Sequence, residues 1–172
     1  WAPRLARDVA LFDQRGCLSV AALYVGERRS AWASALHRAL AALATEWPPG
    51  PPDLAELAAV RMAREEASLR GLELHAGERL ASGSVLVEEE LGFAPSPGLR
   101  TVRIYETRDP EEIGRQLTAW RGRLQGLAIC GEANTDAVIR LGQQLGVSRV
   151  ARAGELQEAP ATWDDGAPRP LA

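Results

Sequence analysis

The 172-residue sequence predicts an α/β fold in which a largely parallel sheet is flanked by helices. Short runs rich in Val, Leu, Ile and Tyr alternate along the chain with amphipathic segments of helix length. Clusters of Gly, Pro, Asp and Asn separate these segments and supply turn and capping signals. The hydrophobic fraction of 46% and the charged fraction of 25% are those of an ordinary globular domain. Because strands that alternate with helices form parallel sheets covered by those helices, we expect that architecture here.

The first half of the chain predicts one strand and two helices. Residues 21–25 form the strand, which a glycine ends. Ser30 is the expected N-cap of a helix over residues 31–46, and a proline-rich run ends that helix. A second helix is expected over residues 53–70, with Asp53 as its cap. The residues expected to form the buried face of this second helix are Leu54, Leu57, Val60, Met62 and Leu69.

The second half predicts further strands and helices, followed by an extended tail. The expected strands are residues 85–87, 101–105, 126–130 and 147–150, and the expected helices are residues 109–122, capped by Asp109, and 134–145, capped by Asn134. Beyond Gly154 the chain is rich in proline and is expected to be extended. We therefore divide it into a domain over residues 1–152 and a C-terminal arm over residues 153–172.

Charge and composition argue against several classes of function. The net charge is −3, and the 20 basic residues, all of them arginine, are scattered, so we expect no nucleic-acid partner. No stretch approaches the roughly 18 apolar residues of a membrane span, and we expect no secretory signal. The two cysteines, Cys17 and Cys130, fit neither a disulfide framework nor a zinc pattern. We therefore expect no metal, and a reducing cytoplasm as the location.

The segment with the clearest chemical potential is the polar turn over residues 13–19, which carries Cys17. The turn separates two apolar runs, so it lies at a boundary between elements. A thiol in such a place can face a cleft and receive backbone N–H groups, which is how proteins activate a nucleophile and build an oxyanion hole. Gly16 permits close approach of a substrate to the backbone. The residues alone leave a second interpretation open, in which Cys17 is a small loop residue without a chemical role.

The sequence Asp13-Gln14-Arg15-Gly16-Cys17-Leu18-Ser19 resembles the active-site segment of the bacterial luminescence-type fatty acyl-CoA reductases, an offshoot of the aldehyde dehydrogenase superfamily. In that superfamily a strand follows the nucleophilic cysteine within a few residues, as residues 21–25 do here. Later segments that look like parts of the same family are residues 123–128, 146–150, 154–157 and Trp163 with residues 165–171. The resemblance extends from about Asp8 to Leu171.

This resemblance implies a two-step reaction on Cys17. The thiolate would attack an acyl thioester, supplied as acyl-CoA or by an acyl donor protein, and form an acyl-enzyme. Hydride from NADPH or NADH would then release an aldehyde, and the backbone N–H of Cys17 would help to hold the oxyanion. The chain begins at Trp1 without a methionine, so we expect a missing N-terminal cofactor-binding domain and little or no turnover by this chain alone. The extended arm is compatible with a homo-oligomer.

Glu90 is a second candidate, and the resemblance again supplies its role. In aldehyde dehydrogenases a glutamate before a Phe-Gly-Pro stretch contacts the nicotinamide ribose, and Glu90 precedes Leu91-Gly92-Phe93-Ala94-Pro95. The order departs from the pattern by an inserted residue, so Glu89 competes for the role. An acidic run that closes a strand in solvent is the other interpretation.

The remaining candidate residues are expected to have structural roles. His37 is expected at the surface or boundary of a helix, His75 in a turn, and Cys130 in the core. Trp32, Trp47 and Trp120 are expected to be helix-packing anchors, and residues 126–131 an ordinary strand-to-helix connection. Two other functions stay open: a non-catalytic α/β interaction module in which Cys17 is structural, and a related reductase that acts on acyl phosphates.

Overall fold

A computed structural model describes residues 1–132 and 135–163 of the chain. The helices are α1 (Ala2–Ala10), α2 (Arg29–Glu46), α3 (Leu54–Leu69), α4 (Pro110–Leu117) and α5 (Thr135–Leu145). The strands are β1 (Ala22–Val25), β2 (Leu74–Ala76), β3 (Ser84–Val87), β4 (Thr101–Glu106), β5 (Gly126–Ile129) and β6 (Arg149–Arg152). No helix in these residues is long and apolar enough to cross a membrane.

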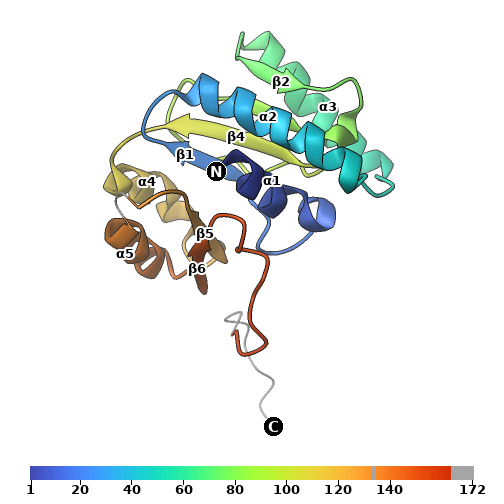
Figure 1. Cartoon of the computed structure of the whole chain (residues 1–172). Helices are drawn as coiled ribbons and strands as arrows, with labels where there is room; N and C mark the ends of the chain where they lie inside the picture. Colours follow the sequence, from blue (N-terminus) through green and yellow to red (C-terminus); the bar gives the residue numbers. More distant parts are fainter. Residues whose placement is uncertain (133–134, 164–172) are drawn as a thin grey trace.

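The strands form two sheets (Figure 1). The main sheet has the order β1-β4-β3-β2, in which β1, β4 and β3 are parallel and β2 is an antiparallel edge strand. β5 and β6 form a separate parallel pair beside α4 and α5. The predicted α/β class with a largely parallel sheet is therefore confirmed.

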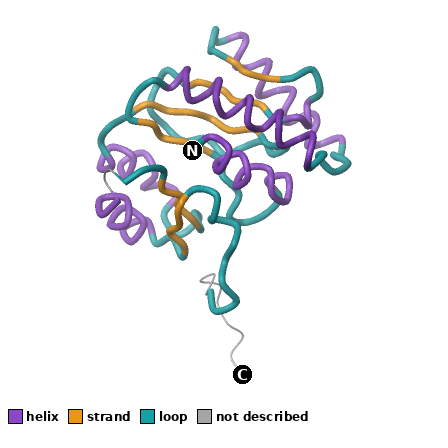
Figure 2. The backbone as a smooth tube through the Cα atoms, in the orientation of Figure 1, coloured by secondary structure: helices purple, strands orange, loops and turns teal. Residues whose placement is uncertain are grey.

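The core of the main sheet follows from the alternation of side chains along its strands. Val85 and Val87 point to the face covered by α1 and α2, and Leu86 points to the face covered by α3. In Figure 2 the helix α2 lies across the sheet, with α1 next to it. A third apolar cluster, which includes Leu117 and Leu141, joins α4 and α5 to the edge of β1. This third cluster borders the site described below.

Two elements were not predicted from the sequence, α1 and β2. α1 buries Leu5 and Val9, one turn apart, against α2 and the sheet. It is only nine residues long, so the periodic signal is short. β2 has three residues and is held by its pairing with β3, which places His75 in a strand rather than in the expected turn. Pairing with a distant strand leaves no local pattern in so short a segment.

The predicted N-cap of the first long helix is wrong. α2 begins at Arg29, and its N-cap is Arg28, which has a left-handed φ of 60°. The Ser30 hydroxyl instead donates a hydrogen bond to Glu73 at 2.6 Å. The Ser30 side chain, which was expected to cap the helix, is thus hydrogen-bonded to a carboxylate from a distant segment instead.

The predicted buried face of α3 is also largely wrong. Leu54, Met62 and Leu69 are 85%, 69% and 90% exposed, and only Val60 of the predicted face is fully buried. The helix packs through Val60, Ala63 and Ala67, and Arg64 on the same side donates hydrogen bonds to Ser84 and to carbonyls of residues 77–83. Small side chains allow close approach to the sheet, and the guanidinium satisfies the backbone of the adjoining turn. The Asp53 cap is confirmed, with Glu56 completing a capping box.

The end of the described chain is packed against α1. β6 lies two residues later than predicted, and Ala153 and Leu156 just beyond it are buried. The Asp8 carboxylate accepts hydrogen bonds from the N–H groups of Gly154 and Leu156 at 2.6 and 3.1 Å. The division at residues 152 and 153 stays a prediction. The predicted Asn134 cap and the arm beyond Trp163 lie outside the described residues.

Candidate active site

A distorted turn leads from α1 to the segment that carries Cys17. A 3-10 turn over Leu11–Gln14 follows the helix. Within it Phe12, Asp13 and Gln14 have φ angles of 59°, 51° and 62°, in the left-handed region that non-glycine residues rarely adopt. Such backbone costs on the order of 1–3 kcal/mol per residue and clusters at functional sites. Other contacts must therefore hold the turn in place.

Asp13 provides the first anchor of this turn. Its Oδ2 accepts a hydrogen bond from the Gly50 N–H at 2.8 Å, and its Oδ1 accepts one from Arg100 Nε at 2.8 Å. Arg100 is itself buried and donates to the Trp47 carbonyl at 3.0 Å. The turn is thereby tied to the loop after α2 and to the start of β4.

Gln14 provides the second anchor. Its Nε2 donates to the carbonyls of Val20 at 2.7 Å and of Thr101 at 2.9 Å, and its Oε1 accepts from the Thr101 N–H at 2.7 Å. The Ser96 hydroxyl lies 3.2 Å from Oε1 but is nearer to the Thr101 carbonyl, at 2.7 Å. The side chain amide therefore uses both of its N–H groups and its oxygen on the backbone around the Cys17 segment.

Cys17 lies in a tight turn, exposed and with a free thiol. The Ser19 N–H donates to the Gly16 carbonyl at 3.0 Å and closes this turn. Within residues 1–132 and 135–163, the N–H groups of Cys17 and Leu18 have no hydrogen-bond acceptor. Two adjacent unpaired N–H groups beside a thiol can stabilise an oxyanion. The prediction that Cys17 lies at an element boundary facing a cleft agrees with this geometry.

The sequence indicated that Gly16 lets a substrate approach the backbone, whereas the space beside it is filled by other side chains of the protein. The φ of Gly16 is not in the left-handed region, but an added Cβ would lie 3.3 Å from Phe12, 3.4 Å from Gln157 and 3.4 Å from Ser19. These neighbours occupy the space beside it, and Gln157 Nε2 also donates to the Ser19 hydroxyl at 3.1 Å. The missing side chain thus makes room for packing around the turn.

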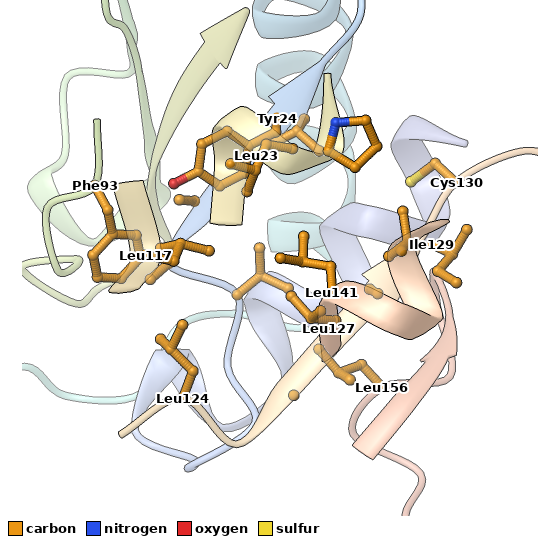
Figure 3. A pocket seen from close by; sticks show the side chains of 18 of the residues that line it. Leu23, Tyr24, Phe93, Leu117, Leu124, Leu127, Ile129, Cys130, Leu141 and Leu156 are labelled. Carbon is orange, nitrogen blue, oxygen red and sulfur yellow. The ribbon is translucent and has the colours of Figure 1, made fainter. Parts of the chain in front are cut away.

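A largely apolar cavity of about 520 Å³ lies between β1 and β5 (Figure 3). Cys17 is among its lining residues. Its walls come from β1, β5, α4 and α5, and the apolar side chains include Leu23, Phe93, Leu117, Leu127 and Leu141. This volume is within the range of small-molecule sites. An exposed thiol at an apolar cavity suits a reaction on a ligand with an apolar tail.

Leu18 connects the Cys17 turn to β5. An added Cβ at Gly126 would lie 2.8 Å from Leu18 Cδ2 and 2.9 Å from Leu156 Cδ1. Those distances are shorter than side chains tolerate, so Leu18 takes its place only because residue 126 is glycine. The resemblance placed this glycine in a late strand of the family without giving it a role.

Cys130 lines the same cavity as Cys17, at the end of β5. It is half-buried and packs against the core, as its core assignment predicted, but it also borders the cavity. Burial raises the pKa of the Cys130 thiol to about 11. At neutral pH this thiol is almost entirely protonated and a poor nucleophile.

The structure does not bring Glu90 to Cys17. Glu89 and Glu90 are exposed and follow the carboxyl end of β3, whereas Cys17 precedes the amino end of the parallel strand β1. The two residues thus lie beyond opposite ends of the parallel strands, and neither glutamate is among the described residues that line the cavity. Glu88, by contrast, is buried and pairs with Arg103 and Arg70. The cofactor role of Glu90 or Glu89 stays a prediction.

The two histidines form a separate pair between α2 and β2. The ring centroids of His37 and His75 are 6.2 Å apart, and His75 Nε2 lies 2.7 Å from Glu73 Oε1. Desolvation and the neighbouring His75 lower the pKa of His37. Neither ring lines the cavity, and no group of three possible metal ligands occurs in the described part of the chain.

The anchoring contacts of Gln14 were missed by sequence reasoning. Gln14 lies in the segment that the sequence singled out, but Thr101 and Ser96 are more than 80 positions away. No periodicity or local motif predicts which side chain amide will reach which distant backbone group. The one available signal was a polar residue at the end of an apolar run, which is common to many turns.

Comparison with known proteins gives two findings. The family model for acyl-CoA reductase (LuxC) matches residues 1–168. A solved structure of an NAD-dependent benzaldehyde dehydrogenase from Corynebacterium glutamicum is similar in fold, with a TM-score of 0.62 and 13% identity. The match covers 88% of this chain and 35% of that chain, so the present chain spans about a third of that protein. No curated protein matches the chain. The chain therefore belongs to the acyl-CoA reductase (LuxC) family, and its fold is that of the aldehyde dehydrogenases.

Proposed function

We propose that this chain is the thiol-bearing catalytic part of an NAD(P)H-dependent acyl-CoA reductase, which forms an acyl-enzyme on Cys17 and releases an aldehyde. The observation that supports this most directly is the position of Cys17, an exposed free thiol at a cavity of about 520 Å³ with largely apolar walls. Membership of the acyl-CoA reductase family supplies the reaction class. The reducing cytoplasm is the proposed location, since it keeps the thiol free.

The first half-reaction is a transfer of the acyl group to sulfur. The Cys17 thiolate attacks the carbonyl carbon of an acyl thioester, a new carbon–sulfur bond forms, and the bond to the donor sulfur breaks. CoA, or the thiol of an acyl donor protein, leaves as a thiolate and takes up a proton. The unpaired N–H groups of Cys17 and Leu18 donate to the carbonyl oxygen as its negative charge develops. The apolar walls of the cavity hold the acyl chain.

The second half-reaction reduces the thioester on Cys17. A reduced nicotinamide supplies the hydride when it is bound. The same two N–H groups would again hold the oxygen, and collapse of the resulting thiohemiacetal returns the Cys17 thiol and releases the aldehyde. No general base is required, because the acyl group leaves as an aldehyde and not by attack of water.

Glu90, or Glu89 beside it, is proposed to accept hydrogen bonds from the ribose hydroxyls of the cofactor. Both carboxylates are exposed and form no ion pair within residues 1–132 and 135–163, so they are free to act as acceptors. In a form of the protein that binds cofactor, Glu90→Gln should raise the cofactor KM several-fold and leave the acylation of Cys17 unchanged. An unchanged KM in both Glu90→Gln and Glu89→Gln would reject this assignment.

The first experiment measures the acyl-enzyme directly. The chain is incubated briefly with a long-chain acyl-CoA and its intact mass is compared among the parent, Cys17→Ser and Cys130→Ser. We expect one acyl adduct in the parent and in Cys130→Ser, and none in Cys17→Ser. No cofactor is needed for this step, so the test is valid even if this chain alone does not turn over.

Two other outcomes are informative. An adduct that persists in Cys17→Ser would move the acylation to another group and contradict the assignment. No adduct, together with slow alkylation of Cys17, would favour a structural role for Cys17 in a non-catalytic module. Repeating the measurement on a longer form that carries the remaining length of the family would then show whether the site requires those additional residues.

A further inference from the structure

We propose that Gln14 is a positioning residue that fixes the place of the Cys17 thiol at the cavity. The inference rests on the proposed function of Cys17 as the nucleophile. It concerns how the thiol is held and not which substrate it attacks.

The strongest argument is the closure of the Cys17 segment by one side chain. Gln14 precedes Cys17, Val20 follows it, and Gln14 Nε2 donates to the Val20 carbonyl at 2.7 Å. The two ends of the segment that contains Cys17 are therefore joined by a single hydrogen bond. The other contacts that hold the segment are the Ser19 N–H to Gly16 carbonyl bond, the side chain of Gln157, and the exposed ion pair of Arg15 with Glu56 on α3.

The same amide fixes the closed segment to the main sheet. Gln14 Nε2 donates to the Thr101 carbonyl at 2.9 Å, and Gln14 Oε1 accepts from the Thr101 N–H at 2.7 Å. Thr101 is fully buried and is the first residue of β4, which lies next to β1 in the sheet. A pair of hydrogen bonds to one buried residue fixes both the distance and the orientation of the amide.

The backbone of Gln14 makes this anchoring necessary. Phe12, Asp13 and Gln14 all have left-handed φ angles, so the turn tends to relax unless it is held. Asp13 also holds the turn, through Gly50 and through Arg100 just before β4, but its carboxylate is not bonded to the residues directly after Cys17 in the described chain. Among the described residues, Gln14 is the one whose side chain joins the strained turn, Val20 after the Cys17 turn and the start of β4.

The test uses two substitutions at position 14 and one matched control. Gln14→Met keeps a similar volume and removes all three hydrogen bonds. Gln14→Gly removes the same bonds and relieves the left-handed backbone. Arg28→Gly is the control, because Arg28 has a φ of 60° at the start of α2, makes no side-chain capping bond and does not line the cavity. It relieves the same kind of backbone strain away from Cys17.

The readouts separate positioning from stability. For each variant we measure the rate of Cys17 acylation over a range of acyl-CoA concentrations, the rate of iodoacetamide alkylation, and the unfolding midpoint. Misplacement of a nucleophile by about 1 Å lowers rates by roughly 10²-fold. We therefore expect Gln14→Met and Gln14→Gly to lower the saturating acylation rate by about 10- to 100-fold, with the half-saturating concentration little changed. Arg28→Gly should leave all the Cys17 rates as in the parent.

A further variant, Gln14→Glu, tests the donor role of the side-chain amide. In Gln14→Glu an ionised carboxylate faces the carbonyls of Val20 and Thr101, whereas a protonated carboxyl can donate to one of them. The acylation rate of this variant, divided by that of the parent at the same pH, should recover as the pH is lowered from 8 to 5. A residue with only a general effect on stability would not produce this recovery.

Failure of this inference can be told from failure of the proposed function. Absence of an acyl adduct both in this chain and in the longer form that carries the remaining length of the family would reject the nucleophile role of Cys17, and the alkylation rates would then decide the positioning role by themselves. If Gln14→Met remains folded and both its acylation and its alkylation of Cys17 stay within about twofold of the parent, Gln14 does not position the thiol.

Discussion

Cys17 and Cys130 line one cavity, but the fold gives them different chemical surroundings. Cys17 lies on an exposed turn, and the N–H groups of Cys17 and Leu18 have no acceptor among the residues that the structure describes. Cys130 follows a strand, packs against the core and has its thiol pKa raised to about 11 by burial. The difference predicts that Cys130 is the less reactive thiol although it borders the same cavity, because a buried thiol stays protonated near neutral pH.

The largest expected effect comes from removing each sulfur in turn. Cys17→Ser should abolish aldehyde formation in a form of the protein that turns over, because serine at this site lacks a base to activate it. Cys130→Ser should keep most of the activity. Aldehyde release measured with acyl-CoA and reduced nicotinamide tests both. Comparable losses in the two variants would break the proposed distinction between the thiols.

A smaller effect is expected where the Cys17 turn packs on β5. Gly126→Ala places a Cβ 2.8 Å from Leu18, so the turn must shift or the variant must lose about 1–3 kcal/mol of stability. We expect a lower unfolding midpoint and slower acylation of Cys17. Gly77→Ala is the matched control, because its Cβ would be 3.7 Å from Ser82, an ordinary contact. Equal behaviour of the two alanine variants would contradict the coupling of Leu18 to the thiol.

The pH dependence of alkylation should separate the thiols further. Because burial raises the pKa of Cys130 to about 11, its thiolate fraction increases about tenfold per pH unit up to that value. The alkylation rate of the peptide that contains Cys130 should therefore rise steadily from pH 7 to pH 10. Quantitative mass spectrometry of both cysteine peptides gives the two profiles from one sample. A plateau for Cys130 below pH 9 would show that its sulfur is less buried than the structure indicates.

The smallest effect is expected from the outward face of α3. Met62 is 69% exposed, so Met62→Gln should change the free energy of unfolding by no more than about 0.5 kcal/mol. It should alter the alkylation rate of neither cysteine, since α3 does not line the cavity. Urea unfolding and the same peptide assay provide the measurement. A change at either thiol would mean that their difference depends on remote structure and not on the local surroundings.

Sequence reasoning succeeded where the signal is local. The alternation of strands and helices predicted the α/β class, and the Asp53 and Asp109 caps marked two helix starts that the structure confirms. The turn of residues 13–19 was correctly placed between two elements, because polar and glycine residues interrupt apolar runs there. The family resemblance drawn from that segment is also confirmed by the match over residues 1–168.

Sequence reasoning failed where a distant segment decides the outcome. Ser30 donates to Glu73 instead of capping its helix. α3 leaves Met62 exposed, while Arg64 on its packed side donates to the turn before β3. β2 exists only through its pairing with β3. In each case a contact with a distant segment, which the local pattern does not show, stabilises the observed conformation more than the local preference stabilises the predicted one.

The sequence by itself therefore determined the class of fold, the order of most elements and the identity of the candidate nucleophile. Only the tertiary structure decided how Cys17 is held, through the amide of Gln14 on Val20 and Thr101. It also decided that Cys17 and Cys130 share a cavity and that Glu90 lies beyond the opposite end of the parallel strands from Cys17. The physical reason is that periodicity and turn signals act over a few residues, whereas a site is assembled from side chains whose partners are dozens of residues away.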